Sequence, residues 1–473
     1  MLRSLWLLFL YLGFLGFGVT TPFVMTLGYV WVDTLRPQDL SMFILNEMPV
    51  AMIMGAGAMG TYLALDRRSP PPMNWVTALL IMLCMWMTAT LVWAEVPSAA
   101  WEKWNWAFKS MAFAAFLPYV IRSRVQIEAF AQTYVFSLAA NIIPFGVKVL
   151  ISGGGYGQNL GLMVGNSGLA ESGSLAVVCL MAIPLALYLG KHGLLVPRFP
   201  IVKWMYPVLA ILSIVTALGT YERSALIGMI VLGGYMFMRS RRKLLFGLIG
   251  GLGTILIIAF TAQSWIERIS TIGQYQKDSS ALVRVLVWQW TFDYSLSHPL
   301  GGSFNSFLVN SVVVPGDEIN PGGQIMFGRA FHSIYFEVLG ELGWPGIIMF
   351  LTVVTLSMLS LRRLSKKTRD NPELAWLSDL SDAVQSGIMV FMSAGAFLGM
   401  AFQPILWYFI SIGIALNAYL WRAERLNVQP LSGWRAKAEA ARGPEGAKST
   451  GWRKPVSIPM EEKARIPGWQ ARR

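Results

Sequence analysis

Apolar runs recur along almost the whole of this 473-residue chain. A helix needs about 20 mostly apolar residues to cross a bilayer, where it satisfies its own backbone hydrogen bonds. Charged residues make up only 13% of the chain, against about 25% in soluble domains. The sequence therefore predicts an all-α polytopic membrane protein with about twelve transmembrane helices. The expected spans are 5–30, 42–65, 76–95, 106–121, 128–151, 173–190, 203–219, 224–239, 244–262, 337–361, 384–402 and 405–421.

The intervals between these runs alternate between basic-rich and basic-poor. With Arg3 on the cytoplasmic side, the short intervals on the opposite side hold only Arg36, Lys103 and Arg223 as basic residues. An excess of lysine and arginine in short cytoplasmic loops sets the orientation of a membrane protein. We therefore expect both termini to be cytoplasmic. The one long polar interval, 263–335, should face outward and contain short helices.

The net charge of +13 at pH 7 does not require a nucleic-acid partner. Much of the excess lies in the tail 422–473, which is rich in Pro, Gly, Ala and Arg, and the remainder lies mostly in the cytoplasmic intervals. Such a composition is typical of a disordered segment resting on anionic lipid headgroups. Docking of a partner protein is the alternative function of this tail.

Two arginines stand out on the outward side. Arg223 follows Glu222 in a very short turn between two apolar runs, and Arg284 lies in segment 281–296. The pattern of that segment predicts an amphipathic helix along the membrane surface. A guanidinium is suited to bidentate contact with phosphate. The simpler explanations are pairing of Arg223 with Glu222 or lipid phosphate, and a solvated or lipid-facing charge at Arg284.

His332 lies at the end of the long interval, just before the tenth apolar run, in the sequence His-Ser-Ile-Tyr-Phe-Glu. A side chain with a pKa of about 6.5 at this boundary can act as a general base. An interfacial histidine that caps the helix is the alternative. Between Arg284 and His332, a proline followed by Gly301 and Gly302 ends the amphipathic helix and allows a close approach of the backbone.

Taken in order, these features resemble the O-antigen ligase and polymerase superfamily over roughly residues 170–420. Residues 28–37 further resemble the branch described as putative O-glycosylation ligases of exosortase-associated systems. The resemblance implies a GT-C-like glycosyltransferase that acts at the periplasmic face of the bacterial inner membrane. It would transfer a saccharide from undecaprenyl pyrophosphate to a hydroxyl of a glycan, lipid or protein acceptor, for example in exopolysaccharide synthesis. Ligases and polymerases share these motifs, so the choice between them stays open.

The resemblance also assigns roles to residues. Arg223 and Arg284 would hold the donor pyrophosphate, and His332 would be the catalytic base, with inversion at the anomeric carbon. Independently of the resemblance, Lys109 and Lys148 fall near the outer ends of the expected helices 106–121 and 128–151. There they would either snorkel to lipid headgroups or form a second ring of donor contacts. Accessory positions fall to Lys109, Lys148, Gly301, Gly302 and Tyr335.

The resemblance divides the chain into an N-terminal transmembrane region (1–170), a catalytic region (171–421) and the tail (422–473). No metal or cofactor is expected, because the arginines neutralise the phosphates and the acids of the long interval form no cluster. Both cysteines fall inside expected helices, so no disulfide is expected either. Envelope polysaccharide assembly proteins are the expected protein partners.

A lipid-linked glycan flippase or transporter is the alternative function, since about twelve helices with both termini inside is also a carrier layout.

Overall fold

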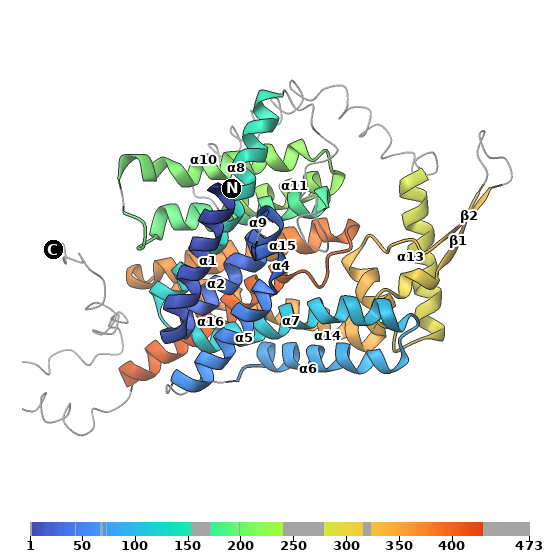
Figure 1. Ribbon diagram of the computed structural model, residues 1–473, viewed down its shortest axis with the longest axis horizontal. Helices are drawn as coiled ribbons and strands as arrows, with labels where there is room; N and C mark the ends of the chain where they lie inside the picture. The colour runs from blue at the N-terminus through green and yellow to red at the C-terminus, as the bar shows by residue number, and fades with distance from the viewer. Residues whose placement is uncertain are drawn as a thin grey trace, which may run out of the picture.

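The computed structural model describes residues 2–42, 44–66, 70–71, 73–152, 171–197, 199–239, 279–315 and 323–428 (Figure 1). The α-helices are α1 (Leu2–Thr20), α2 (Pro22–Leu35), α3 (Pro37–Leu40), α4 (Ile44–Glu47), α5 (Val50–Leu65), α6 (Trp75–Ala89), α7 (Pro97–Val120), α8 (Arg124–Ile151), α9 (Ser172–His192), α10 (Pro200–Gly219), α11 (Arg223–Arg239), α13 (Ser279–Ser297), α14 (Ile334–Thr368), α15 (Ala375–Ala394) and α16 (Pro404–Val428). Short 3₁₀ helices are η1 (Thr90–Trp93), η2 (Ser306–Val309), η3 (Pro372–Leu374) and η4 (Gly395–Phe397). Two short strands, β1 (Ser311–Val314) and β2 (Gln324–Phe327), pair antiparallel.

Six helical segments in the described ranges are long and apolar enough to cross a membrane. They are Leu2–Thr20, Trp75–Trp93, Arg124–Ile151, Ser172–His192, Ile334–Thr368 and Pro404–Arg425. The prediction of a multi-pass membrane protein built from helices is therefore confirmed. The count of twelve helices and the GT-C likeness stay predictions, and the expected span 244–262 lies outside the described residues.

Two expected spans were wrong because each is interrupted at a proline and forms two helices. The span 5–30 is two helices, since α1 ends at Thr20 and α2 begins at Pro22. Thr21 between them is extended, with φ −133° and ψ 97°, as favoured for a residue that precedes proline. Similarly, the span 42–65 becomes the short helix α4 and then α5, with Pro49 between them.

Helix α7 begins at Pro97, well before the expected start at residue 106. The alternation of charge placed Lys103 in an outward loop. This prediction was wrong, because Lys103 lies inside α7. Lys109 lies near the middle of α7 and not at its outer end, which corrects a second expectation. Lys148 does lie in the last turn of α8.

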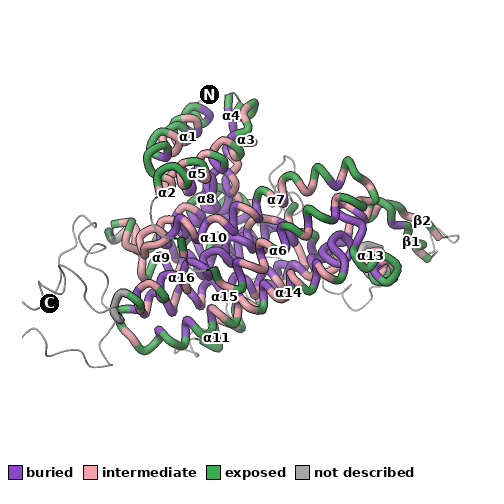
Figure 2. The backbone as a smooth tube through the Cα atoms, turned by 90° about the horizontal axis from the view of Figure 1, so that it is seen from below, coloured by how far each residue is buried: buried purple, intermediate pink, exposed green. Residues whose placement is uncertain are grey.

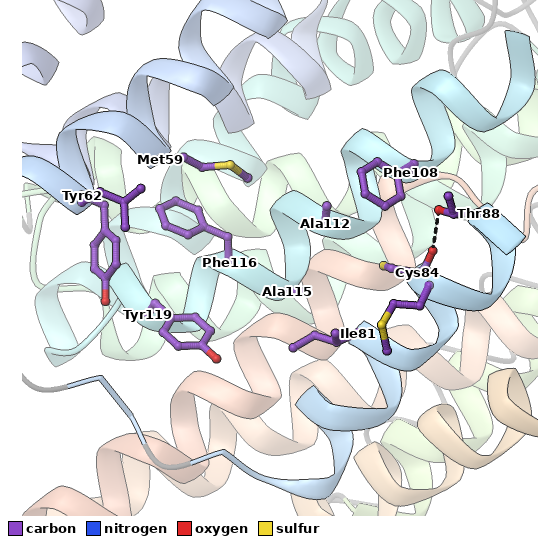
Figure 3. A pocket seen from close by; sticks show the side chains of 12 residues that line it. Met59, Tyr62, Ile81, Cys84, Thr88, Phe108, Ala112, Ala115, Phe116 and Tyr119 are labelled. Carbon is purple, nitrogen blue, oxygen red and sulfur yellow. Dashed lines mark hydrogen bonds between the residues drawn. The ribbon is translucent and has the colours of Figure 1, made fainter. Parts of the chain in front are cut away.

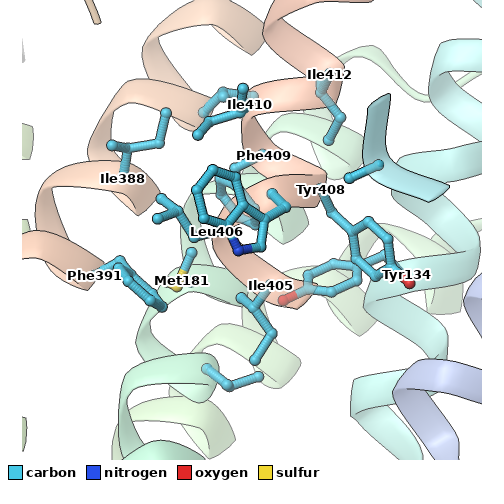
Figure 4. Packing of buried hydrophobic residues seen from close by; sticks show 14 of the residues in the cluster. Tyr134, Met181, Ile388, Phe391, Ile405, Leu406, Tyr408, Phe409, Ile410 and Ile412 are labelled. Atoms are coloured by element: carbon cyan, nitrogen blue, oxygen red, sulfur yellow. The ribbon is translucent and has the colours of Figure 1, made fainter. Parts of the chain in front are cut away.

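The core lies where α8, α9, α15 and α16 meet. Almost every residue of α9 is buried, whereas α1 buries few (Figure 2). Figure 4 shows the aromatic packing at this junction, where the rings of Tyr134 and Phe409 meet edge to face with their centres 5.9 Å apart. The free cysteine Cys179 is buried on α9. The central helices thus bury their apolar side chains against one another, and the exposed apolar faces of the outer helices are available to lipid.

Basic residues that the sequence placed on one side of the membrane contact one another at one end of the bundle. Arg422 donates to the carbonyl of Arg122 at 3.0 Å, and Arg124 donates to the carbonyl of His192 at 3.2 Å. Lys191 on α9 pairs with a carboxylate on α15. These contacts agree with the predicted alternation. The described part of the tail continues α16 to Val428, and residues 429–473 lie outside the described ranges.

Candidate functional site

Helix α13 lies across one end of the bundle, near the ends of α6 and α7 (Figure 1). Its Trp288 donates from Nε1 to the carbonyl of Phe331 at 2.8 Å and stacks on Phe336 with ring centres 5.3 Å apart. Val287 is buried with Phe331 and Val312, which belongs to β1. The predicted helix over 281–296 is therefore confirmed, and it fixes the backbone immediately before His332.

Gly301 and Gly302 pack against a break in α14. Gly343 interrupts that helix with φ +67° and ψ −167°, and Gly301 has φ +76°. A Cβ on Gly301 would lie 2.4 Å from the Gly343 nitrogen, and one on Gly302 would lie 2.4 Å from the hydroxyl of Tyr294. The amide of Gly302 donates to the carbonyl of Gly340 at 2.9 Å. These contacts explain why positions 301 and 302 require glycine, since a side chain would not fit there. A contact of either glycine with a ligand stays a prediction.

His332 occupies a left-handed backbone conformation, with φ +46°. This region is uncommon for residues other than glycine and costs about 1–3 kcal/mol. The side chain is half-buried, between the buried residues Phe331 and Ser333, and α14 begins directly after Ser333. Such strain persists only where the surroundings impose it, and it is concentrated at functional sites. The geometry therefore marks His332 as a candidate functional residue.

Charged groups from three elements face the imidazole of His332. Burial and the guanidinium of Arg284 on α13 lower the pKa of His332, while the carboxylates of Glu222 and Glu337 act in the opposite direction. The net effect places the pKa of His332 below its ordinary value. At neutral pH the imidazole is therefore mostly uncharged, which is the form that accepts a proton.

Arg284 and Glu222 both act on the imidazole of His332, and Arg223 directly follows Glu222 in the chain. Arg223 begins α11 directly after Glu222, whose Oε1 accepts a hydrogen bond from Ser172 Oγ at 2.6 Å. Partial desolvation and the nearby Glu222 raise the pKa of Glu171, while Arg284 lowers it. Glu171 could not be selected from the sequence, because an acid that precedes a helix is ordinary.

Lys103 is buried between two glutamates of α14. Its Nζ donates to Glu337 Oε1 at 2.6 Å and to Glu341 Oε1 at 2.8 Å. The amide of Asn305 also donates to Glu341 Oε1, and the amide of Ala401 donates to Glu337 Oε2, each at 2.9 Å. We missed this cluster in the sequence. Two acids one turn apart in an apolar helix were the signal, because such acids require a partner.

A polar cavity of about 330 Å³ opens beside this cluster. Glu102, Lys103 and Trp106 of α7 form one wall, and Asn305 and Glu337 contribute to the lining. The remaining lining residues are Gly399, Met400, Phe402 and Gln403. The cavity adjoins the backbone of His332, since a Cβ placed on Gly399 would lie 3.9 Å from both the His332 backbone nitrogen and Glu337 Oε2.

Residues 208–351 match the family model described as O-Antigen ligase, and this range contains Arg223, Arg284 and His332. This match supports membership of the O-antigen ligase superfamily. Membership supports a glycosyltransferase role of the ligase or polymerase type. Residues 2–194 match a family of unknown function (DUF5935). No curated protein matches the chain.

The two matched regions meet at the polar cavity. Lys103 and Trp106 belong to the region of unknown function, whereas Glu337 and Glu341 belong to the O-antigen ligase region. The expected exosortase-associated branch stays a prediction, because the N-terminal match carries no assigned role.

A larger cavity, of about 710 Å³, lies between α5, α6 and α7 (Figure 3). Apolar and aromatic side chains line it, including Tyr62, Phe108 and Phe116, and the free cysteine Cys84 contributes to the wall. It has no lysine, arginine, histidine or carboxylate in its lining. We therefore regard the smaller polar cavity as the relevant one for chemistry.

No contact with His332 is found for the side chains of the remaining predicted accessory residues in the described ranges. The hydroxyl of Tyr335 donates to the carbonyl of Met392 at 2.9 Å, which holds α14 against α15. Lys109 and Lys148 are exposed, and within the described ranges neither contacts His332 or Arg284. Among the described residues, no group of three or more histidines, cysteines or acids could hold a metal ion.

Proposed function

We propose that the protein transfers a saccharide from a polyprenyl-pyrophosphate carrier, with undecaprenyl as the expected lipid, to an acceptor hydroxyl. His332 is the general base, and Arg223 and Arg284 bind the donor pyrophosphate. The observation that carries the proposal is the half-buried imidazole in a strained backbone, beside Arg284 and inside the matched O-antigen ligase region.

The base is required because a sugar or serine hydroxyl is far too weak an acid to ionise at neutral pH. As the acceptor oxygen bonds to the anomeric carbon, its proton passes to the neutral imidazole of His332. The bond from that carbon to the pyrophosphate oxygen breaks at the same time and its electron pair leaves with the lipid. Attack opposite the leaving group inverts the anomeric carbon. General base catalysis of this kind contributes about 10²–10⁴-fold.

The arginines act on the leaving group. Negative charge develops on the departing pyrophosphate oxygen, and guanidiniums positioned there stabilise the transition state more than the ground state. Glu171 and Glu222 also face this region and would repel a diphosphate. Burial and the nearby Glu222 raise the pKa of Glu171, and the guanidinium of Arg284 acts in the opposite direction. Arginine binding makes a metal ion unnecessary for charge neutralisation in this proposal.

The proposed reaction takes place at the periplasmic face of the bacterial inner membrane. Support comes from the alternation of charge, which assigns the intervals around Arg122 and Arg422 to the cytoplasm and the interval that holds His332 to the opposite side. The acceptor is a glycan, lipid or protein hydroxyl, and envelope polysaccharide assembly proteins are the expected partners.

Replacing His332 by asparagine tests the base. Asparagine tolerates the left-handed backbone better than alanine, so His332→Asn should keep the fold while removing the base. We expect transfer from a polyprenyl-pyrophosphate glycan in proteoliposomes to fall about 10²–10⁴-fold, with unchanged thermal stability. His298→Asn is the matched control, because His298 stacks on Tyr294 in the same interval.

Wild-type rates in His332→Asn would refute the base assignment. Movement of the lipid-linked glycan across the membrane without release of polyprenyl pyrophosphate would instead support a flippase.

A further inference from the structure

The polar cavity beside His332 has lining groups that are not used by the protein itself. Within the described residues, the side chains of Glu102, Trp106 and Gln403 make no hydrogen bond or ion pair, although all three line the cavity. By contrast, the Lys103 ammonium already donates to Glu337 and Glu341. The cavity therefore presents an unpaired carboxylate, an amide and an indole N–H to whatever enters.

The charge of this cavity excludes the donor diphosphate. Its lining holds two carboxylates, Glu102 and Glu337, against one cation, Lys103, and Glu341 adds a third acid behind the wall. A diphosphate would be repelled here and attracted to the side of His332 that carries Arg284. A neutral molecule with many hydroxyls suits the cavity, because carboxylate and amide oxygens accept hydrogen bonds from hydroxyls.

The size and shape of the cavity agree with a sugar unit. Small-molecule sites occupy about 300–1,000 Å³, and this one measures about 330 Å³. Trp106, which is partly exposed, supplies an aromatic face on which the C–H groups of a pyranose can pack. The lining thus combines apolar faces with a few hydrogen-bonding groups that fix orientation.

We propose that this cavity binds a neutral saccharide unit of the acceptor and presents its hydroxyl to His332. The proposal rests on the transferase function proposed above. It assigns a role to the region that matches the family of unknown function, because Glu102 and Trp106 come from that region. The O-antigen ligase region would then supply the base and the donor contacts, and the N-terminal region would select the acceptor.

The first test separates acceptor binding from donor binding. Release of polyprenyl pyrophosphate is measured in proteoliposomes while the acceptor is varied, using the glycolipid and glycan fraction of cells that lack this protein. We expect Trp106→Ala and Gln403→Ala each to raise the half-saturating acceptor concentration about 10-fold, as expected for one lost contact. The half-saturating donor concentration should change less than about twofold. Trp101→Ala is the control, since Trp101 lies on the same helix but is 58% exposed and outside the cavity.

The second test reports binding without turnover. Both native cysteines are buried, so a cysteine introduced by Gln403→Cys is the expected site of reaction with a membrane-impermeant maleimide. The acceptor fraction should slow this labelling at least about fivefold, and inorganic pyrophosphate should not.

The outcomes keep the two proposals apart. Normal transfer with unchanged acceptor saturation in both variants, or labelling slowed by pyrophosphate and not by acceptor, would overturn the acceptor cavity and leave the transferase intact. Wild-type protein that releases no polyprenyl pyrophosphate would overturn the transferase, and the acceptor cavity with it.

Discussion

The two sides of His332 hold their charges differently. On the side of α13, Arg284 acts on the imidazole through space and makes no hydrogen bond or ion pair to a described residue. On the cavity side, Lys103 is buried and donates to both Glu337 and Glu341. The first arrangement leaves a cation available to an arriving anion, whereas the second is already neutralised and holds α7 against α14. We infer that Arg284 binds the anionic donor, whereas the ion pairs of Lys103 position α7 against α14.

The largest effect should come from breaking the lysine side. In Lys103→Met, two buried carboxylates lose their only cation, and removing one member of a buried ion pair costs about 3–5 kcal/mol. We expect a large fall in the thermal unfolding temperature of the detergent-solubilised protein, measured by tryptophan fluorescence. Adding Glu341→Gln should restore part of it, because one surplus charge is removed. Lys109→Met, exposed on the same helix, should unfold like wild type, and equal losses in the two lysine variants would contradict the comparison.

The arginine side should affect rate without affecting stability. Arg284→Gln removes the guanidinium that we place on the leaving pyrophosphate, and loss of one such electrostatic contact costs about 10²–10³-fold in rate. The unfolding temperature should stay close to that of wild type, because Arg284 makes no pair within the described residues. A variant that unfolds early but transfers normally would reverse the assignment of the two sides.

The pH dependence of transfer should also depend on the arginine side. Burial and Arg284 lower the pKa of His332, so the neutral, active base persists below its usual pKa of about 6.5. We expect the acid limb of kcat/KM to lie below that value in wild type. Removing the Arg284 charge raises the pKa and should move the limb to higher pH, whereas Glu222→Gln removes an opposing charge and should move it lower. Limbs that do not move in these opposite directions would show that the titrating group is not His332.

The smallest effects should come from the exposed lysines on the bundle surface. If Lys109 and Lys148 only snorkel to lipid headgroups, Lys109→Met and Lys148→Met should each alter transfer less than about twofold, since surface changes are usually within ±0.5 kcal/mol. Initial rates at subsaturating donor provide the measurement. A tenfold loss in either variant would favour the second ring of donor contacts.

The elements that could be predicted from sequence are those with a local signal. The apolar run around Cys179 became the buried helix α9, and the pattern after Ala281 became α13. The break at Pro22 was readable as well, since proline begins helices and disfavours helix in the residue before it. We overlooked it because the apolar run continues across it.

The elements that escaped prediction depend on contacts distant in sequence. Lys103 looks like a loop charge until α14 brings Glu337 and Glu341 to it, more than 200 residues later. The pairing of β1 with β2 was also missed, although a run of three valines, 312–314, favours a strand. Composition alone cannot indicate which distant partner neutralises a charge or completes a strand pair.

A crossed kinetic measurement tests the central claim most directly. Half-saturating concentrations of donor and acceptor are determined for Arg284→Gln and Trp106→Ala in the same proteoliposome preparation, beside wild type. We expect Arg284→Gln to weaken binding of the donor only and Trp106→Ala to weaken binding of the acceptor only. Equal changes in both constants for both variants would contradict a base flanked by separate donor and acceptor sites.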